Sequence, residues 1–343
     1  RLWFCSGSWA LGRRSMISSM MTDRMTRLEV SRFQLKARTR RADGALLRVW
    51  FGESLFGLSE LMPWTSLGDP SLETLLGDLR AGRLGSRLIE RALEMARVEA
   101  VARENQESLF SAPVANHFLV AGPGPLAPGD WLDIRRRGFS AVKIKISNVA
   151  ELASTLAMAP SWIGNLRLRL DMNAKAGADD LLLALDRLPV LVRDRIEFIE
   201  DPIPFDGATW GALSRRSGIR LMLDREGAEL KLSEKIECFK SGVFGGFIHK
   251  PGWTADDEAL ALAKAGAPVV VTSLLGHPIG QLHAARVANQ LMSSLGSDAV
   301  HGCFSHIAYD QGVEFKYLQT AGSKLLPMLW PAEALMKIKW ERL

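Results

Sequence analysis

The sequence predicts an α/β protein in which a (β/α) barrel carries a smaller α+β capping domain. The chain has 343 residues, enough for a barrel of roughly 250 residues and a second domain of about 100. From His117 onward, strand-like and helix-like patterns alternate, as they do in parallel sheets. Three of these strands end in an acid, at Asp171, Glu200 and Asp224. The spacings of 29 and 24 residues are each typical of one strand, one loop and one helix.

The capping domain is predicted from the first hundred residues. A turn signal at Ala42–Gly44 predicts a β-hairpin, a Gly- and Pro-containing stretch predicts a loop, and apolar residues at helical spacing predict two helices. The hairpin strands are Leu28–Arg38 and Ala45–Gly52, the loop is Gly52–Asp69, and the helices are Ser71–Ala81 and Ser86–Glu104.

The barrel strands are short apolar segments bounded by turn residues. They are His117–Ala121, Ala141–Ile146, Leu166–Asp171, Glu197–Glu200, Arg220–Asp224, Gly246–Lys250 and Val269–Ser273, with a weaker eighth at Ala299–Cys303. Helices are expected between them, including Ala178–Val192, Ala255–Ala265 and Gln281–Ser293. Pro189 is expected only to disfavour the last turn of the first helix.

These patterns divide the chain into four parts. We interpret residues 1–26 as an extension or disordered segment, 27–115 as the capping domain and 116–320 as the barrel. The apolar segment 321–343 is expected to return to the capping domain.

Composition excludes several classes of partner. The formal net charge is +5, but the basic residues are scattered apart from Arg38–Arg41 and Arg135–Arg137. No aromatic platform accompanies them, so nucleic acid is not expected. No apolar run approaches the roughly 20 residues that span a bilayer. The cysteines, Cys5, Cys238 and Cys303, lack CxxC spacing, which predicts reduced thiols and a cytoplasmic protein. A homo-oligomer stays open.

The three acids predict a metal site. One acid at a strand end is commonly a helix N-cap or a loop contact, but three in successive units converge at the mouth of a barrel. Three hard oxygen ligands suit Mg²⁺, with Mn²⁺ as a substitute. Asp171, Glu200 and Asp224 are therefore the candidate ligands.

Lysines lie on the strands before and after the acids. Lys143 and Lys145 are two residues apart on one strand, so both side chains are expected to face the barrel interior. The alternative is a pair of solvated surface lysines, but Val142, Ile144 and Ile146 already provide an apolar outer face. Two neighbouring ammonium groups near a dication are expected to lower each other's pKa, which suits a general base.

Lys250 ends the sixth strand and is expected to reach a bound substrate from the side opposite Lys145; loop solvation is the alternative. Asn173 and Asp201 accompany the acids. Asp201 either orients a metal ligand or only begins a loop. Together the residues favour removal of a proton next to a carboxylate, with a metal stabilising the resulting enediolate.

The chain resembles the muconate-lactonising-like branch of the enolase superfamily. The resemblance spans about residues 27–343 and rests on a KxK pair, three acids on successive strands and a lysine on the sixth. The matching motifs are Lys143-Ile144-Lys145, Asp171-Met172-Asn173, Glu200-Asp201-Pro202, Leu223-Asp224 and Lys250-Pro251. It implies a modified, enolase-type TIM barrel with a cap and a small carboxylate substrate.

Within that branch the chain is most similar to the o-succinylbenzoate synthase family of menaquinone biosynthesis, through Phe51-Gly52-Glu53, Lys250-Pro251 and His301-Gly302. The resemblance implies syn-dehydration of 2-succinyl-6-hydroxy-2,4-cyclohexadiene-1-carboxylate. Lys145 would take the α-proton and assist departure of the hydroxyl group. Lys250 would stabilise the enediolate from the opposite face, and Lys143 would tune Lys145.

The chain departs from the family pattern at two positions. Arg225 follows Asp224, where an acid is usual. The loop after strand seven, residues 273–278, keeps Ser273 and Gly276 but lacks the usual serines. Gly276 is expected to expose backbone N–H groups to the succinyl carboxylate.

Other functions use the same scaffold. An N-acylamino acid racemase or a dipeptide epimerase would use two lysines as opposing bases, although residues 273–280 lack the acids typical of dipeptide epimerases. A muconate-type cycloisomerase and a catalytically inactive barrel are the remaining alternatives.

Overall fold

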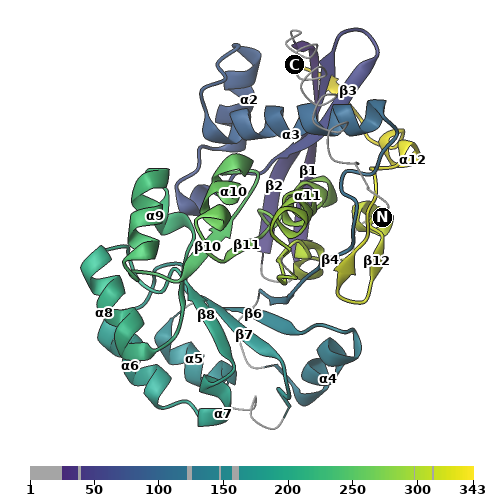
Figure 1. Ribbon diagram of the computed structural model, residues 1–343. Helices are drawn as coiled ribbons and strands as arrows, with labels where there is room; N and C mark the ends of the chain where they lie inside the picture. Colours follow the sequence, from purple (N-terminus) through teal and green to yellow (C-terminus); the bar gives the residue numbers. More distant parts are fainter. Residues whose placement is uncertain are drawn as a thin grey trace, which may run out of the picture.

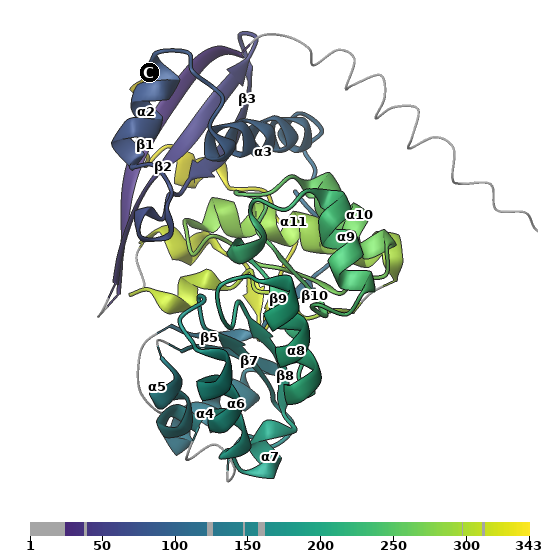
Figure 2. The ribbon, with the colours of Figure 1, turned by 90° about the vertical axis from the view of Figure 1, so that its left-hand side faces the viewer.

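The computed structural model consists of a barrel-forming parallel sheet below an antiparallel cap sheet (Figures 1 and 2). It describes residues 25–37, 40–121, 126–146, 148–156, 162–296, 298–310 and 313–343. Residues 1–26, which were expected to be an extension or a disordered segment, lie almost entirely outside the described ranges. No helix among the described residues has the length and hydropathy needed to cross a bilayer.

The barrel strands form one parallel sheet in the order β11-β10-β9-β8-β7-β6-β5. Their bounds are β5 Phe118–Val120, β6 Ala141–Lys145, β7 Arg167–Asp171, β8 Ile196–Glu200, β9 Leu221–Leu223, β10 Gly246–His249 and β11 Val269–Val271. The predicted eighth strand is reduced to two parallel bridges, Asn116 with His301 and Thr272 with Gly302. Because they reach the two edge strands of the sheet, these bridges close the barrel.

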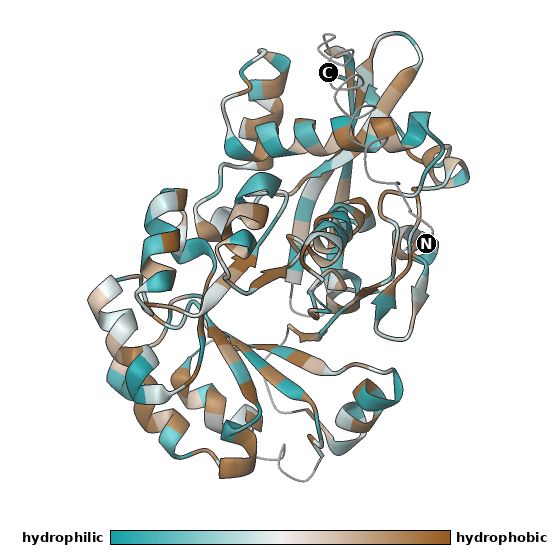
Figure 3. Cartoon of the chain, viewed as in Figure 1, coloured by the Kyte–Doolittle hydropathy of each residue, from teal (hydrophilic) through white to brown (hydrophobic). Residues whose placement is uncertain are grey.

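Helices surround the strands, and both hydrophilic and hydrophobic residues occur along them (Figure 3); many of the hydrophobic ones belong to the buried core. The helices are α4 Pro128–Arg136, α5 Val149–Leu156, α6 Ala178–Asp186, α7 Val190–Arg193, α8 Gly207–Ser217, α9 Leu232–Lys240, α10 Asp256–Lys264 and α11 Pro278–Leu295. Short 3₁₀ turns are η3 Arg225–Gly227, η4 Ser305–Ala308 and η5 Val313–Tyr317. The single helix predicted over Ala178–Val192 is wrong, because Pro189 is the N-cap of a separate helix, α7.

The cap sheet has the order β14-β1-β2-β3. Its elements are β1 Met25–Ala37, β2 Arg40–Phe51, β3 Leu55–Leu61, η1 Thr65–Leu67, α2 Leu72–Arg80, α3 Arg87–Glu104 and β14 Glu341–Arg342. Strand β14 pairs with β1, so residues from both ends of the chain form this sheet. The predicted (β/α) barrel with an α+β cap is therefore confirmed.

Two details of the cap differ from the prediction. The hairpin does not turn at Ala42–Gly44, because Gly44 pairs with Phe33 inside the β1–β2 ladder. A Cβ atom at Gly44 would lie 2.4 Å from the Phe33 ring, so this glycine provides space for an aromatic side chain. The segment predicted as a loop, Gly52–Asp69, contains β3, which pairs with β2 through seven residue pairs.

A small three-stranded sheet lies at both of the expected domain boundaries, 115/116 and 320/321. Its order is β12-β13-β4, with bounds β12 Thr320–Ala321, β13 Lys324–Leu325 and β4 Val114–Ala115. Helix α12, Ala332–Leu335, follows. The division into 27–115, 116–320 and 321–343 stays a proposal.

Strand β3 packs very closely on helix α3. A Cβ atom at Gly57 would lie 1.8 Å from the Ala96 carbonyl oxygen, and the Leu58 N–H donates to the buried Glu99 carboxylate at 3.0 Å. Only glycine allows this approach, which fixes α3 on the cap sheet.

Replacing Gly57 with alanine is expected to lower the free energy of unfolding by about 1–3 kcal/mol, because backbone must move to admit the methyl group. Urea unfolding followed by circular dichroism measures the loss. Gly77→Ala is the control: a Cβ there meets nothing within 4 Å, and alanine in helix α2 should stabilise the protein by about 0.5–1 kcal/mol. Equal stability of Gly57→Ala and wild type would contradict the packing argument.

Candidate active site

The predicted acids and lysines lie at the carboxyl ends of neighbouring barrel strands. In the β6–β7–β8 ladder, Lys145 is opposite Asp171, and Asp171 is opposite Glu200. Glu200 is in turn opposite Met222 of β9, two residues before Asp224. The side chains therefore lie at similar heights at one end of the sheet.

Direct contacts join the first half of this set. The Lys143 Nζ atom lies 2.6 Å from Glu200 Oε2 and 3.0 Å from Asp171 Oδ2. The Lys145 Nζ atom lies 2.9 Å from the same Asp171 oxygen. Asp171 and Glu200 are almost completely buried, whereas the Lys145 side chain is 23% exposed. Lys145 is thus the lysine of the pair that solvent or a substrate can reach.

The second half continues from Glu200. The Lys250 ammonium group donates to Asp224 Oδ2, and its Nζ atom lies 3.9 Å from Glu200 Oε1. Acids and ammonium groups thus alternate in one connected set, here called the acid–lysine row. In order of contact, its members are Lys145, Asp171, Lys143, Glu200, Lys250 and Asp224.

The carboxylates of the acid–lysine row act on the pKa of Lys143. Burial alone would lower the pKa of its ammonium group, but the charges of Asp171 and Glu200 raise it overall. In this set the carboxylates outweigh the neighbouring ammonium group, whereas the predicted lowering concerns lysines beside a bound dication and stays a prediction. Burial would raise the pKa of Asp171, yet the charges of Lys143 and Lys145 lower it. Burial and the Asp171 charge raise the pKa of Glu200.

Over the described ranges, no group of three carboxylate, imidazole or thiol side chains has the arrangement of a metal shell. The oxygens of the acid–lysine row face ammonium groups instead. These contacts neutralise acids that would otherwise be buried with uncompensated charge.

Asp201 holds the end of strand β9. Its carboxylate accepts the Asp224 N–H at 2.9 Å and the Glu226 N–H at 3.2 Å, and its backbone has φ +40°. Burial and the Asp224 charge raise the pKa of this carboxyl group well above its usual value. Asn173 lies in a left-handed turn, with φ +47°. Of the two interpretations of Asp201, the geometry favours the one in which it orients Asp224.

The loop after β11 packs against the cap. Ser273 is buried, and its backbone N–H donates to the Gly302 carbonyl at 3.3 Å. The space beside Gly276 is filled by Glu60 of the cap: a Cβ atom there would lie 2.2 Å from the Glu60 carboxylate, and one at Gly280 1.8 Å from it. The His277 N–H donates to Glu60 at 2.6 Å. Glu60 thus occupies the amino end of helix α11.

The sequence interpretation missed Glu60, although a signal was present: it is an acid within an otherwise apolar strand. Burial raises the pKa of its carboxyl group to about 8, partly offset by the His277 hydrogen bond.

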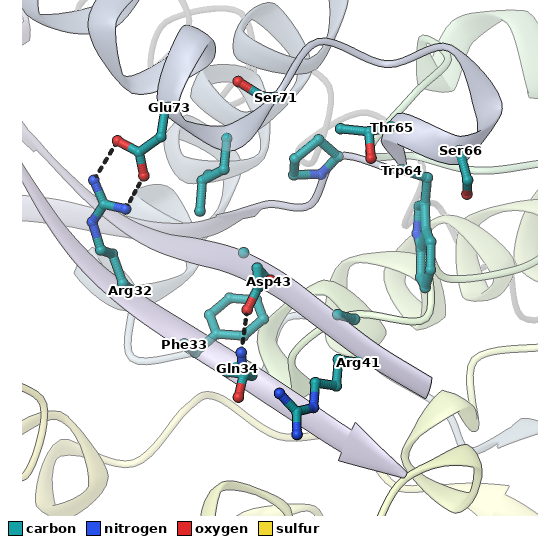
Figure 4. Close-up of a pocket in the computed structure, with 14 residues that line it drawn as sticks. Arg32, Phe33, Gln34, Arg41, Asp43, Trp64, Thr65, Ser66, Ser71 and Glu73 are labelled. Atoms are coloured by element: carbon teal, nitrogen blue, oxygen red, sulfur yellow. Dashed lines mark hydrogen bonds and ion pairs between the residues drawn. The ribbon is translucent and has the colours of Figure 1, made fainter. Parts of the chain in front are cut away.

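A separate cavity of about 630 Å³ lies in the cap (Figure 4). It opens between the β1–β2 hairpin and residues 63–73, with Arg41 on one side and Trp64 on the other. An ion pair between Arg32 and Glu73 borders it, with one N–O distance of 2.9 Å. None of its lining residues belongs to the acid–lysine row.

Comparison with known proteins identifies the family. Residues 27–102 match the family described as "O-succinylbenzoate synthase, N-terminal domain". An o-succinylbenzoate synthase of Bdellovibrio bacteriovorus is 32% identical over 290 residues, which cover 83% of this chain and 85% of the relative. The chain belongs to the o-succinylbenzoate synthase family. Its members are carbon–oxygen lyases, so the chain is an enzyme.

Solved structures agree with this family at the level of the fold. The L-Ala-D/L-Glu epimerase from Bacillus subtilis has a TM-score of 0.75 at 15% identity, covering 90% of this chain and 97% of the epimerase. The N-succinyl Arg/Lys racemase from Bacillus cereus has a TM-score of 0.74 at 15% identity, covering 93% and 99%. The o-succinylbenzoate synthase family thus shares its scaffold with racemases and epimerases.

Glu60→Gln is expected to change how stability depends on pH. Because the folded-state pKa is raised from 4.5 to about 8, the folded protein holds a proton that the unfolded chain releases. Wild type should therefore lose stability as pH rises from about 4.5 to about 8, by on the order of 5 kcal/mol from this group. Glutamine cannot titrate, so the variant should lack this loss.

Urea unfolding at several pH values tests the expectation. Glu90→Gln is the control, because Glu90 is an exposed carboxylate on α3 and should leave the pH slope unchanged. The same slope in wild type and Glu60→Gln would show that Glu60 is not protonated in the fold.

Proposed function

We propose that the protein catalyses the Mg²⁺-dependent syn-dehydration of 2-succinyl-6-hydroxy-2,4-cyclohexadiene-1-carboxylate to o-succinylbenzoate, a step of menaquinone biosynthesis. The observation that carries the proposal is the acid–lysine row at the carboxyl ends of β6–β10. The row places a partly exposed lysine, Lys145, beside buried acids. Membership of the o-succinylbenzoate synthase family supports the same reaction.

The acids of the row fit a divalent metal. Asp171, Glu200 and Asp224 offer only carboxylate oxygens, the donors preferred by Mg²⁺ and Mn²⁺, and they stand on or directly after three adjacent strands. We assign them as the residues that would hold Mg²⁺. When bound, the metal would draw electron density from the substrate carboxylate.

Lys145 is assigned as the base. Its side chain is the most exposed of the row's lysines, at 23% against 7% for Lys143 and 14% for Lys250. As a neutral amine it would take the proton α to the substrate carboxylate. The electron pair of that C–H bond becomes the new ring double bond as the C–O bond breaks. Lys145 then returns the proton to the departing hydroxyl group, which leaves as water.

Lys250 and Lys143 would act through charge. Lys250, next to the last member of the row, Asp224, is assigned to stabilise negative charge on the substrate as the proton leaves. Lys143 is buried between Asp171 and Glu200. It would hold the two acids in place and keep Lys145 beside a second positive charge.

A second candidate is racemisation of an N-acylamino acid. It is favoured by the separation of Lys145, the first member of the row, from Lys250, the fifth, because each could exchange a proton with one face of a substrate. The described residues 273–280 contain no acid to bind a dipeptide ammonium group, so dipeptide epimerisation is less favoured.

We also propose that the enzyme works in the cytoplasm on a small carboxylate, without nucleic acid. Both described cysteines, Cys238 and Cys303, are free thiols, as expected in a reducing compartment. Light scattering would show whether the protein forms a homo-oligomer.

Glu200→Gln tests the metal assignment. The substitution keeps the shape of the side chain but removes one negative charge, so we expect a loss of kcat of about a hundredfold or more and weaker Mg²⁺ binding by calorimetry. Circular dichroism should show an intact barrel. Wild-type activity with unchanged metal affinity would refute Glu200 as a ligand.

Lys145→Ala tests the base. Removing the only proton acceptor should abolish both dehydration and exchange of the substrate α-proton with deuterium, followed by NMR. Lys250→Arg keeps the charge and should retain a trace of dehydration. If the reaction is racemisation, Lys145→Ala and Lys250→Ala should each lose exchange for one enantiomer only. Robust dehydration by Lys145→Ala would exclude the proposed mechanism.

A further inference from the structure

Arg225, the residue that departs from the family pattern, contacts the cap. Its Nη1 and Nη2 atoms each lie 3.1 Å from one carboxylate oxygen of Asp69. The side chains are only 13% and 7% exposed. A two-point arginine–carboxylate pair is stronger and more specific in geometry than a single hydrogen bond. Because the pair is shielded from solvent, it should contribute more stability than an exposed surface ion pair does.

Asp69 ends the segment Met62–Asp69, here called the capping loop. Its carboxylate also accepts the Trp64 backbone N–H at 2.8 Å. The Trp64 indole N–H donates to the Leu274 carbonyl at 2.7 Å. The capping loop is therefore fixed to the barrel at two places, after β9 through Arg225 and after β11 through Leu274.

Arg225 also contacts the turn that follows Lys250. Its guanidinium lies 4.9 Å from the centre of the Trp253 ring, within the range of a cation–π contact. The Trp253 backbone N–H donates to the Lys250 carbonyl at 2.8 Å. Arg87 of helix α3 lies 4.7 Å from the same ring. The cap thus reaches the end of β10 from α3 as well as from the capping loop.

Two residues of the acid–lysine row are neighbours of this cluster. Arg225 follows Asp224 by one peptide bond, so whatever fixes the backbone of Arg225 also restrains the backbone of Asp224. On its other side, the Asp224 N–H donates to the Asp201 carboxylate, and the Asp224 carboxylate accepts from Lys250. Trp253 closes the turn that begins at Lys250.

We propose that the Asp69–Arg225–Trp253 cluster positions Asp224 and Lys250, so that the docked capping loop holds the last two members of the acid–lysine row in place. Arg225 is a positioning residue in this proposal. The effect on turnover rests on the proposed function, whereas the mechanical coupling between the loop and the strand ends does not. Loosening the cluster should lower kcat, because groups that act on the substrate would be misplaced.

The test uses Arg225→Met, Asp69→Asn and the double variant. Methionine keeps an unbranched apolar stem but cannot pair with Asp69. Backbone hydrogen exchange is measured by mass spectrometry on the full chain without substrate, and kcat and KM are measured with Mg²⁺. Each single variant should exchange faster in both 62–69 and 224–227, and should lose kcat about ten- to a hundredfold.

Two further variants sharpen the result. The double variant should be no worse than either single variant, since both remove the same contact. Arg225→Lys should recover part of kcat, because lysine can pair with one Asp69 oxygen. Arg32→Met is the matched control: it breaks another two-point pair of the cap, Arg32 with Glu73, and should leave kcat and exchange in 224–227 unchanged.

Additive losses in the double variant would overturn the proposal. So would faster exchange confined to 62–69, or a lower Tm with unchanged kcat. If wild type does not dehydrate the substrate at all, the proposed function fails, and the exchange measurements alone decide the coupling. If wild type is active and Arg225→Met matches it, the coupling fails and the proposed function stands.

Discussion

The structure depends on the mutual neutralisation of three acids and three lysines at one end of the barrel. The side chains of Asp171 and Glu200 are almost completely buried. A buried carboxylate without a partner of opposite charge is strongly destabilising. Lys143 lies within 3.0 Å of both. This constraint requires the strands to stay in register, because a shift of one residue would turn these side chains to the other face.

The cap is attached through the same loops that end these strands. Glu60 occupies the amino end of α11 after β11, and Asp69 meets Arg225 after β9. Arg91 of α3 donates to the Pro251 carbonyl at 2.9 Å and pairs with Asp256 at 2.6 Å. The elements that close the site from above are therefore also those that define the loops around it.

The acids and lysines were predictable because each follows from the local period of one strand. Features that arise from contacts across the chain were not. Gly44 looked like a turn residue, since its role as space for Phe33 appears only once two strands are paired. The contact partner of Arg225 is Asp69, which is 156 residues away in the sequence. Burial of Glu60 could have been suspected from its strand, but its partner at α11 could not.

The pairing of β14 with β1 has a consequence for biosynthesis. Glu29 and Val30 lie opposite Arg342 and Glu341, so the cap sheet gains its outer strand only after the ribosome has made the whole barrel. Until then, β1 presents unpaired N–H and C=O groups to other nascent chains. Charged side chains along β1, such as Arg27, disfavour intermolecular pairing at such an edge. Because β14 pairs with β1 only at Glu29 and Val30 among the described residues, the rest of β1 is an edge in the finished protein as well, and its charged side chains protect that edge both during and after synthesis.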